Sequence, residues 1–207
     1  MARASRLPVA IALVVAVAGC GGAHRKGLLG MHSSFCGERG KHVAFPILDK
    51  AKTYTATVQT NLGRFAFALD VKDSPCTTSS FASLARDHFY DGLTFHRIVP
   101  GFVIQGGDPN GNGSGGPGYT VVDTPPADAS YARGVVAMAK TGAEPPGTSG
   151  SQFFVVTGAD AGLSPDYALL GKVTGGLDVV ERIGRLGNPQ NEQPTRRIVI
   201  RRIVVAA

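Results

Sequence analysis

Short segments in which apolar and polar residues alternate dominate the chain from residue 53 to its end. Residues 54–60 and 64–69 alternate on either side of an Asn-Leu-Gly turn, which predicts a β-hairpin. Further apolar runs predict strands at 95–99, 102–105, 135–139, 153–157, 168–173 and 196–205. The pattern is therefore typical of a mainly β domain.

Two segments follow a helical period instead. Ser74 suits an N-cap and Pro75 the first helical turn, and the apolar residues that follow share one helical face up to about Arg86. Residues 177–183 form a second amphipathic pattern, and the glycine-rich stretch 106–118 interrupts the strands as a long loop. Many short strands with two helices indicate a β-barrel or sandwich capped by helices.

The first twenty residues have the character of an export signal. Two arginines precede 12 apolar residues, Leu7–Ala18, a run too short to cross a bilayer as a helix. The sequence Val-Ala-Gly-Cys that ends at Cys20 resembles the bacterial lipobox, whose cysteine is acylated. We therefore expect residues 1–20 to be a lipoprotein signal peptide and Cys20 to carry the lipid. A plain signal peptide with an incidental cysteine is the alternative.

These features predict an exported protein, lipid-anchored to the outer face of the bacterial cytoplasmic membrane in the cell envelope. Residues 21–52 show no sustained period and are interpreted as a tether with some local structure near residues 45–48, and residues 53–207 as the folded domain. The chain is 43% hydrophobic and 17% charged, which excludes a disordered protein.

Charge and cysteine content exclude other classes. The formal charge is +6, but the densest basic group, at residues 196–202, alternates with Ile and Val and is interpreted as a solvated strand face, so no nucleic-acid partner is expected. The three cysteines form no metal-ligand pattern, and no metal or other cofactor is expected. Export permits Cys36 and Cys76 to form a disulfide, and two separate thiols are the alternative.

Three segments carry the functional signal. They are FHRIVPGFVIQGGD at 95–108, SGSQFFV at 149–155 and LSPDYALLGKV at 163–173. In order and spacing they resemble the signature segments of the cyclophilins, and the resemblance extends over about residues 53–205. It implies a closed eight-stranded antiparallel barrel capped by two helices, and peptidyl-prolyl cis/trans isomerase activity.

The resemblance also assigns roles to individual residues. Arg97 is the expected donor to the twisted prolyl imide, with Phe102, Gln105 and His96 as the other catalytic candidates, although His96 is equally well explained as a structural histidine. The expected substrate-binding residues are Val103, Ala139, Lys140, Thr141, Gln152, Phe154, Leu163 and Tyr167. Lys140 and Thr141 depart from the Ala-Asn-Ala common in the family, and residues 144–147 resemble a short insertion.

Three functions remain compatible with these residues. An isomerase would act on proline-containing peptides and unfolded exported proteins as a monomer. A binding module would keep the proline pocket with little catalysis, and a surface lipoprotein would use the domain as a spacer. A guanidinium beside an apolar pocket favours the isomerase, because a spacer has no need of one.

Overall fold

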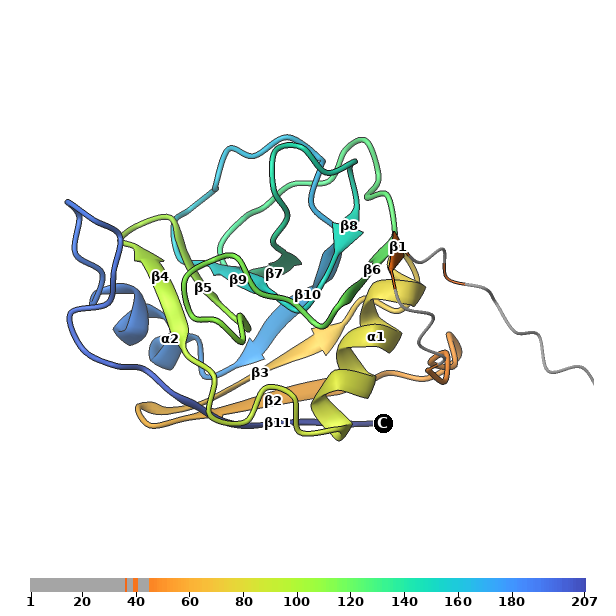
Figure 1. Cartoon of the computed structure of the whole chain (residues 1–207), viewed down its shortest axis with the longest axis horizontal. Helices are drawn as coiled ribbons and strands as arrows, with labels where there is room; N and C mark the ends of the chain where they lie inside the picture. Colours follow the sequence, from red (N-terminus) through yellow and green to blue (C-terminus); the bar gives the residue numbers. More distant parts are fainter. Residues whose placement is uncertain (1–35, 37–38, 41–44) are drawn as a thin grey trace, which may run out of the picture. The chain divides into compact units, whose positions relative to one another are not determined.

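The computed structural model describes residues 36, 39–40 and 45–207 (Figure 1). The predicted signal peptide and Cys20 lie outside the described residues, and the predicted tether is described only in part. The elements, in chain order, are β1 (Arg39–Gly40), β2 (Thr55–Thr60), β3 (Gly63–Leu69), α1 (Pro75–Arg86), β4 (Phe95–Val99), β5 (Val103–Gly106), β6 (Tyr119–Val122), β7 (Val135–Met138), β8 (Thr148–Ser149), β9 (Phe153–Val156), β10 (Leu169–Gly175), α2 (Leu177–Gly184) and β11 (Ile200–Ala206).

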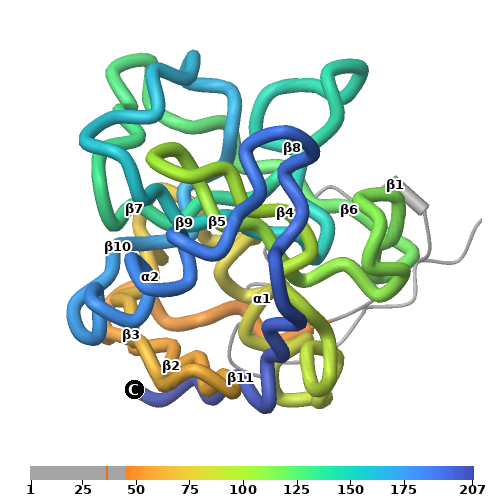
Figure 2. The backbone as a smooth tube through the Cα atoms, turned by 90° about the vertical axis from the view of Figure 1, so that its left-hand side faces the viewer, coloured from red at the N-terminus to blue at the C-terminus, as the bar shows by residue number. Residues whose placement is uncertain are grey.

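Eight antiparallel strands form one curled sheet in the order β11-β2-β3-β10-β7-β9-β5-β4 (Figures 1 and 2). The eight strands and the two helices confirm the predicted class. The prediction of a closed barrel is wrong, because the sheet is open. Its edge strands β11 and β4 form no ladder with each other. They meet only where they begin, through an isolated bridge between Thr94 and Val199 and backbone hydrogen bonds such as that from the Phe95 N–H to the Ile198 carbonyl (3.1 Å).

The sheet stays open because a loop occupies part of the β4 edge. The Ile98 N–H donates to the carbonyl of Glu192 (2.7 Å), in the segment between α2 and β11. This also corrects the predicted strand at 196–205, which begins only at Ile200. Just before it, the side chain of Asn61 bonds the Arg197 carbonyl (3.1 Å) and the Val199 N–H (3.0 Å) and so holds residues 197–199 against the β2–β3 turn.

The central strands bury both of their faces. All four residues of β9 are buried, and they alternate between two apolar clusters. Phe153 and Val155 join the cluster that includes the buried faces of α1 and α2, whereas Phe154 and Val156 join a second cluster with Tyr131. We call the first side of the sheet the helix face and the second the pocket face. The alternation follows from the two-residue period of a strand.

Both helices cover the helix face. α1 lies against β6, β10 and β11, and α2 against β3, β4 and β5 (Figure 1). α1 begins at Pro75 as predicted, but the Ser74 side chain makes no capping hydrogen bond. The Asp123 carboxylate accepts from the Thr77 N–H instead (2.6 Å), so a distant loop caps the helix.

A small second sheet, β1-β6-β8, was not predicted. A disulfide between Cys36 and Cys76 joins its edge to the start of α1, with 5.4 Å between the two Cα atoms, which decides between the two alternatives left open by the sequence. Phe45 stacks on Tyr119 with 6.2 Å between ring centroids. Cys36, Phe45 and Ile47 thus pack against the domain.

Within the part of the chain that the structure describes, no helix is long and apolar enough to cross a membrane. The same residues contain no group of three or more His, Cys, Asp or Glu side chains placed to hold a metal ion.

We expect removal of the disulfide to destabilise the domain. The bond links residues 40 positions apart, and closing a loop of that length lowers the entropy of the unfolded chain enough to stabilise the fold by about 4 kcal/mol. Denaturant unfolding of the double variant Cys36→Ala/Cys76→Ala measures this difference. Unfolding curves that coincide with those of the oxidised protein would contradict it.

Candidate active site

A row of paired residues crosses the pocket face of the sheet. Arg97 of β4 lies opposite Gln105 of β5, which lies opposite Phe154 of β9, which lies opposite Ala137 of β7. Residues paired across antiparallel strands share one face. The register therefore brings a guanidinium, an amide and an aromatic ring side by side from segments far apart in the chain.

A β-bulge at His96 places Arg97 in this row. Phe95 pairs with Gly106 and Arg97 with Gln105, so His96 is the extra residue. In a regular strand Phe95 and Arg97 would face the same side, and Phe95 belongs to the helix-face core. The extra residue reverses the alternation, as bulges near active sites commonly do, and turns the arginine to the pocket face.

Beside the row lies a pocket of about 200 Å³. Its lining residues are Arg97, Phe102, Val103, Gln105, Ala139, Lys140, Phe154, Leu163 and Tyr167. The volume is below the range of about 300–1,000 Å³ that holds drug-sized ligands, and it suits a single apolar side chain. Apolar groups form its wall, and the guanidinium stands at its edge.

A tight turn supplies Phe102. The Phe102 N–H bonds the Val99 carbonyl (3.0 Å) across Pro100 and Gly101, and Gly101 has φ +73°. Proline followed by a residue with positive φ describes a type II turn. The Phe102 carbonyl then accepts from the Thr157 N–H (2.8 Å), which fixes the turn to the end of β9.

The floor of the pocket is an aromatic cluster that sequence reasoning found only in part. Phe154 and Tyr167 meet edge to face with centroids 5.6 Å apart, and Tyr131 packs against both. The Tyr131 hydroxyl donates to the Tyr167 carbonyl (2.7 Å) and accepts from its N–H (3.0 Å). Tyr131 is fully buried, and burial raises the pKa of its hydroxyl. It lies in none of the three signature segments, which is why it was missed.

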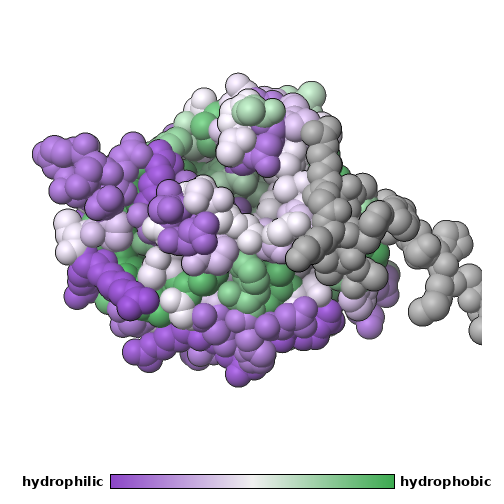
Figure 3. Space-filling view, in the orientation of Figure 1, coloured by the Kyte–Doolittle hydropathy of each residue, from purple (hydrophilic) through white to green (hydrophobic). Residues whose placement is uncertain are grey.

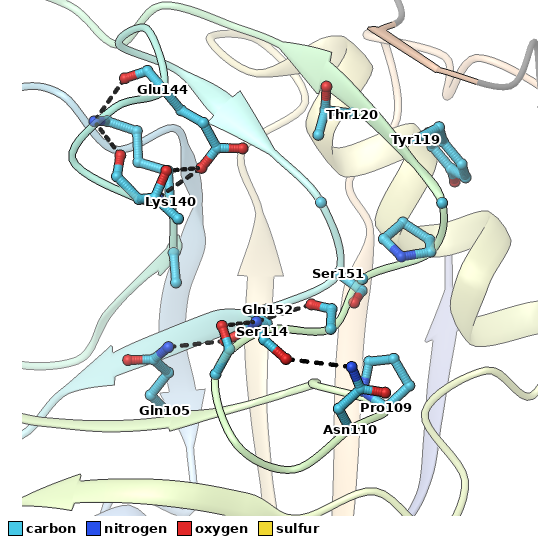
Figure 4. A pocket seen from close by; sticks show the side chains of 18 residues that line it. Gln105, Pro109, Asn110, Ser114, Tyr119, Thr120, Lys140, Glu144, Ser151 and Gln152 are labelled. Carbon is cyan, nitrogen blue, oxygen red and sulfur yellow. Dashed lines mark hydrogen bonds between the residues drawn. The ribbon is translucent and has the colours of Figure 1, made fainter.

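Directional hydrogen bonds hold the polar side of the pocket, and Figure 4 shows the two amide side chains that take part, Gln105 and Gln152. Arg97 Nη1 donates to Gln105 Oε1 (3.3 Å), and Gln105 Nε2 donates to Gln152 Oε1 (3.0 Å). Gln152 Nε2 donates in turn to the carbonyls of Gly113 and Gly115, both at 2.9 Å. Because a guanidinium only donates, it fixes the orientation of both amides.

Hydrogen bonds to Asp108 fold the glycine-rich loop, and in this fold the carbonyls of Gly113 and Gly115 accept from Gln152. Although burial raises the pKa of Asp108, the backbone N–H groups of Asn110, Gly113 and Asn112 donate to its carboxylate and hold the pKa below its ordinary value. A side chain at Gly115 would collide with that carboxylate. The loop is thus a rigid end point for the amide chain.

A second cavity of about 560 Å³ adjoins the first (Figure 4). Gln105, Ala139 and Lys140 line both cavities, whereas the predicted residues Thr141 and Gln152 line only the second. Lys140 Nζ donates to the carbonyls of Thr141 (3.3 Å) and Glu144 (3.1 Å) and lies 5.5 Å from the centroid of the Tyr167 ring. The Glu144 carboxylate accepts from the Thr141 N–H (2.6 Å) and hydroxyl (2.9 Å), so the proposed insertion closes on itself beside the cavity mouth.

The structure separates His96 from the other predicted residues. Its ring lines a different hollow, with Thr94, Gly111 and Arg197 among the neighbours, because the bulge gives it no cross-strand partner. Burial lowers the pKa of His96; the negative charge of Asp108 opposes this shift, and the positive charge of Arg97 adds to it. The imidazole thus lies outside the pocket that the other catalytic candidates line. The remaining predicted site residues that the structure describes line the two adjoining cavities, and Cys20 lies outside the described residues.

Comparison with known proteins agrees with this geometry. Residues 55–205 match the family model "Cyclophilin type peptidyl-prolyl cis-trans isomerase/CLD". Peptidyl-prolyl cis-trans isomerase A of Mycobacterium tuberculosis is 37% identical over 172 residues, which cover 74% of this chain and 93% of that protein. Peptidyl-prolyl cis-trans isomerase B of Bacillus subtilis is 42% identical over 121 residues, 58% of this chain and 82% of that protein.

Solved structures give the same result. A cyclophilin-type peptidyl-prolyl cis-trans isomerase of Cryptosporidium parvum superposes with a TM-score of 0.70 at 31% identity and covers 75% of this chain and 99% of that one. The same enzyme has been solved in the presence of the dipeptide Ala-Pro, with a TM-score of 0.68. The chain therefore belongs to the cyclophilin-type peptidyl-prolyl cis-trans isomerases, enzymes that accelerate rotation about X–Pro peptide bonds.

Proposed function

We propose that the protein isomerises X–Pro bonds by holding the proline ring in the apolar pocket while Arg97 donates to the prolyl nitrogen as the bond twists. The observation that carries the proposal is the row Arg97, Gln105 and Phe154, which sets a guanidinium at the edge of a cavity sized for one side chain. The apolar side chains of the pocket exclude water from the proline ring. The Arg97 guanidinium lies next to the prolyl nitrogen, whose lone pair localises as the bond twists.

The energetics require no covalent step. Rotation about the amide is opposed by a barrier of about 18–20 kcal/mol, because resonance keeps the nitrogen lone pair delocalised. Bringing spontaneous times of tens to hundreds of seconds to roughly milliseconds means about five factors of ten, or about 7 kcal/mol. Preferential binding of the twisted imide supplies this, since the lone pair localises on nitrogen and becomes an acceptor only in the transition state.

Arg97 suits the donor role on three grounds. Its guanidinium is permanently charged, so its donating power does not depend on pH. The bonds to Gln105 and Glu192 use two of its five N–H donors and leave the others for a ligand. The same two bonds hold the planar group in one orientation, which lowers the cost of positioning it during the reaction.

The two adjoining cavities suggest how a peptide lies. With proline in the smaller cavity, the flanking residues extend past Ala139 and Lys140, which border both, into the larger one. The structure of the Cryptosporidium relative in the presence of Ala-Pro supports a proline dipeptide as the minimal ligand class. The cation of Lys140 at this junction makes the mouth more basic than the Ala-Asn-Ala common in the family.

We propose that the substrates are unfolded exported proteins and that the enzyme acts as a monomer. We further propose that a lipid on Cys20 anchors it to the outer face of the cytoplasmic membrane. The support is the short apolar run and the lipobox-like residues of the amino terminus. Acyl chains contribute about 0.8 kcal/mol per buried CH₂, and stable anchoring requires two signals or more. The disulfide is consistent with an oxidising location.

We expect Arg97→Ala to lower kcat/KM for a short X–Pro peptide about 100-fold, because removing a donor that acts mainly in the transition state costs about 3 kcal/mol. NMR exchange spectroscopy on the peptide measures the rate. Arg133→Ala is the matched control, since Arg133 is also half exposed and ion-paired but lies outside the pocket. An Arg97→Ala variant with the wild-type rate would refute the mechanism, and peptide binding without acceleration in the wild type would favour a binding module.

Tyr131→Phe is expected to loosen the pocket floor. The change leaves the N–H and carbonyl of Tyr167 without their shared partner, at a cost of about 1–3 kcal/mol in the free energy of unfolding. We also expect a several-fold weaker peptide Kd, because the Tyr167 ring lines the cavity. Denaturant unfolding and titration calorimetry check the two effects, with Tyr54→Phe, whose hydroxyl lies far along the chain from the pocket, as the control. An unchanged Kd would show that Tyr131 does not support the site.

Cys20→Ala is expected to release the protein from the membrane fraction or to block its maturation, because no acyl chain can then be attached. Fractionation of cells that produce the variant, followed by immunoblotting, measures this. Arg133→Ala, which retains Cys20 and the disulfide, serves as the control. Unchanged membrane association of Cys20→Ala would exclude the lipid anchor.

A further inference from the structure

The segment between α2 and β11 lies along the edge of β4, next to Arg97. Figures 1 and 2 both show this segment beside β4, and Figure 3 shows it as a hydrophilic projection at the left of the molecule. The Glu192 carbonyl accepts from the Ile98 N–H (2.7 Å), and the Glu192 N–H donates to the Asn188 carbonyl (2.8 Å). The backbone at Glu192 is therefore fixed to the strand that carries the arginine.

The conformation of Glu192 is unusual for its residue type. Its φ is +59°, and within the described residues only His88 shares a positive φ without being glycine. Glycine adopts this region without cost, whereas other L-residues are disfavoured there. A glutamate thus occupies a position at which the backbone alone would favour glycine, so its side chain must account for its presence.

That side chain forms an ion pair with Arg97. Glu192 Oε2 lies 2.7 Å from Arg97 Nε, and the side chains are 47% and 35% exposed. An ion pair this exposed contributes little to stability, since solvent screens it. Stability therefore does not explain the glutamate. What the pair does provide is a second fixed point on the guanidinium.

Two fixed points define the orientation of a planar group. Glu192 holds the Nε side, and Gln105 accepts from Nη1 (3.3 Å) on the sheet side. The guanidinium is thereby restrained at Nε and at one of its two terminal nitrogens, Nη1. Without the carboxylate, only the longer bond to the neutral amide of Gln105 remains among these contacts.

We infer that Glu192 is a positioning residue, which orients the Arg97 guanidinium toward the pocket and so raises kcat. The inference rests on the proposed role of Arg97 as the donor to the twisted imide. A donor aimed before the substrate arrives needs no reorganisation in the transition state, and small misplacements of such groups are costly in rate.

Glu192→Gly tests the inference without straining the loop. Glycine removes the carboxylate and adopts the same positive φ, so the backbone bonds to Ile98 and Asn188 are preserved. We expect kcat for a short X–Pro peptide to fall about tenfold while KM stays within about twofold, since binding by the apolar pocket is untouched. The midpoint of thermal unfolding should not fall.

Two further variants separate positioning from charge and from general loop damage. Glu192→Gln keeps an oxygen acceptor at the same length without the charge, and it should restore at least about half of kcat, because a hydrogen bond is enough to orient the group. Gln190→Ala alters an exposed side chain of the same loop, and its rate should equal that of the wild type. A tenfold loss in Gln190→Ala as well would assign the effect to the loop and overturn the inference.

A double-mutant cycle with Arg97→Ala makes the test decisive. If Glu192 acts through Arg97, Glu192→Gly has no further effect on the residual rate of the Arg97→Ala protein. The inference is overturned if Glu192→Gly causes the same loss of rate in both backgrounds, or if Glu192→Gly alone keeps the wild-type kcat. In either case a slow Arg97→Ala protein still supports the proposed role of Arg97. A wild-type rate for Arg97→Ala would instead refute the proposed mechanism itself.

A spectroscopic signature tests the same point independently of rate. In the wild-type protein the Nε–H of Arg97 is hydrogen-bonded to Glu192, so its ¹H–¹⁵N signal should be shifted and protected from exchange with water. The signal should broaden or move to the free position in Glu192→Gly and persist in Gln190→Ala. An identical signal in all three proteins would contradict the restraint.

Discussion

The constraint on which the site depends is that the central strands bury both of their faces. A strand directs successive side chains to opposite sides, so each strand that contributes to the helix-face core also contributes to the pocket face. β9 shows this residue by residue, since Phe153 completes the aromatic core with Phe81 while Phe154 forms the pocket floor. The pocket is therefore built on the opposite face of the strands that form the close-packed core.

One irregularity converts this regular sheet into a site. The extra residue in β4 releases Arg97 from the side that Phe95 faces and aligns it with Gln105 and Phe154. The polar groups then form a chain of hydrogen bonds that all run in one direction. It starts at the Arg97 guanidinium, which only donates, passes through the amides of Gln105 and Gln152, and ends at backbone carbonyls, which only accept. In such a chain only one orientation of each amide satisfies every hydrogen bond. The loop that is bonded to Asp108 carries the last acceptors of the chain.

The sequence predicts those elements and site residues that are encoded by neighbouring residues in the chain. The β2–β3 hairpin and both helices follow from periodicity and turn residues, and the apolar pocket residues follow from the signature segments. Closure of the barrel could not be predicted, because it depends on whether β11 or the loop around Glu192 meets the β4 edge, which no periodicity encodes. Tyr131 and Glu192 were missed for a related reason: each contributes through a partner distant in the chain, across separations of 36 and 95 residues.

The disulfide has a consequence for distance as well as for stability. If, as proposed, a lipid is attached at Cys20, the disulfide at Cys36 is the first covalent link between that end of the chain and α1. Sixteen residues separate the two positions, and fully extended they reach at most about 55 Å. The bond therefore limits the distance of α1 from the lipid surface, and with it that of the folded domain that carries the pocket. Nascent chains would be met within a layer next to the membrane, comparable in depth to one or two small domains.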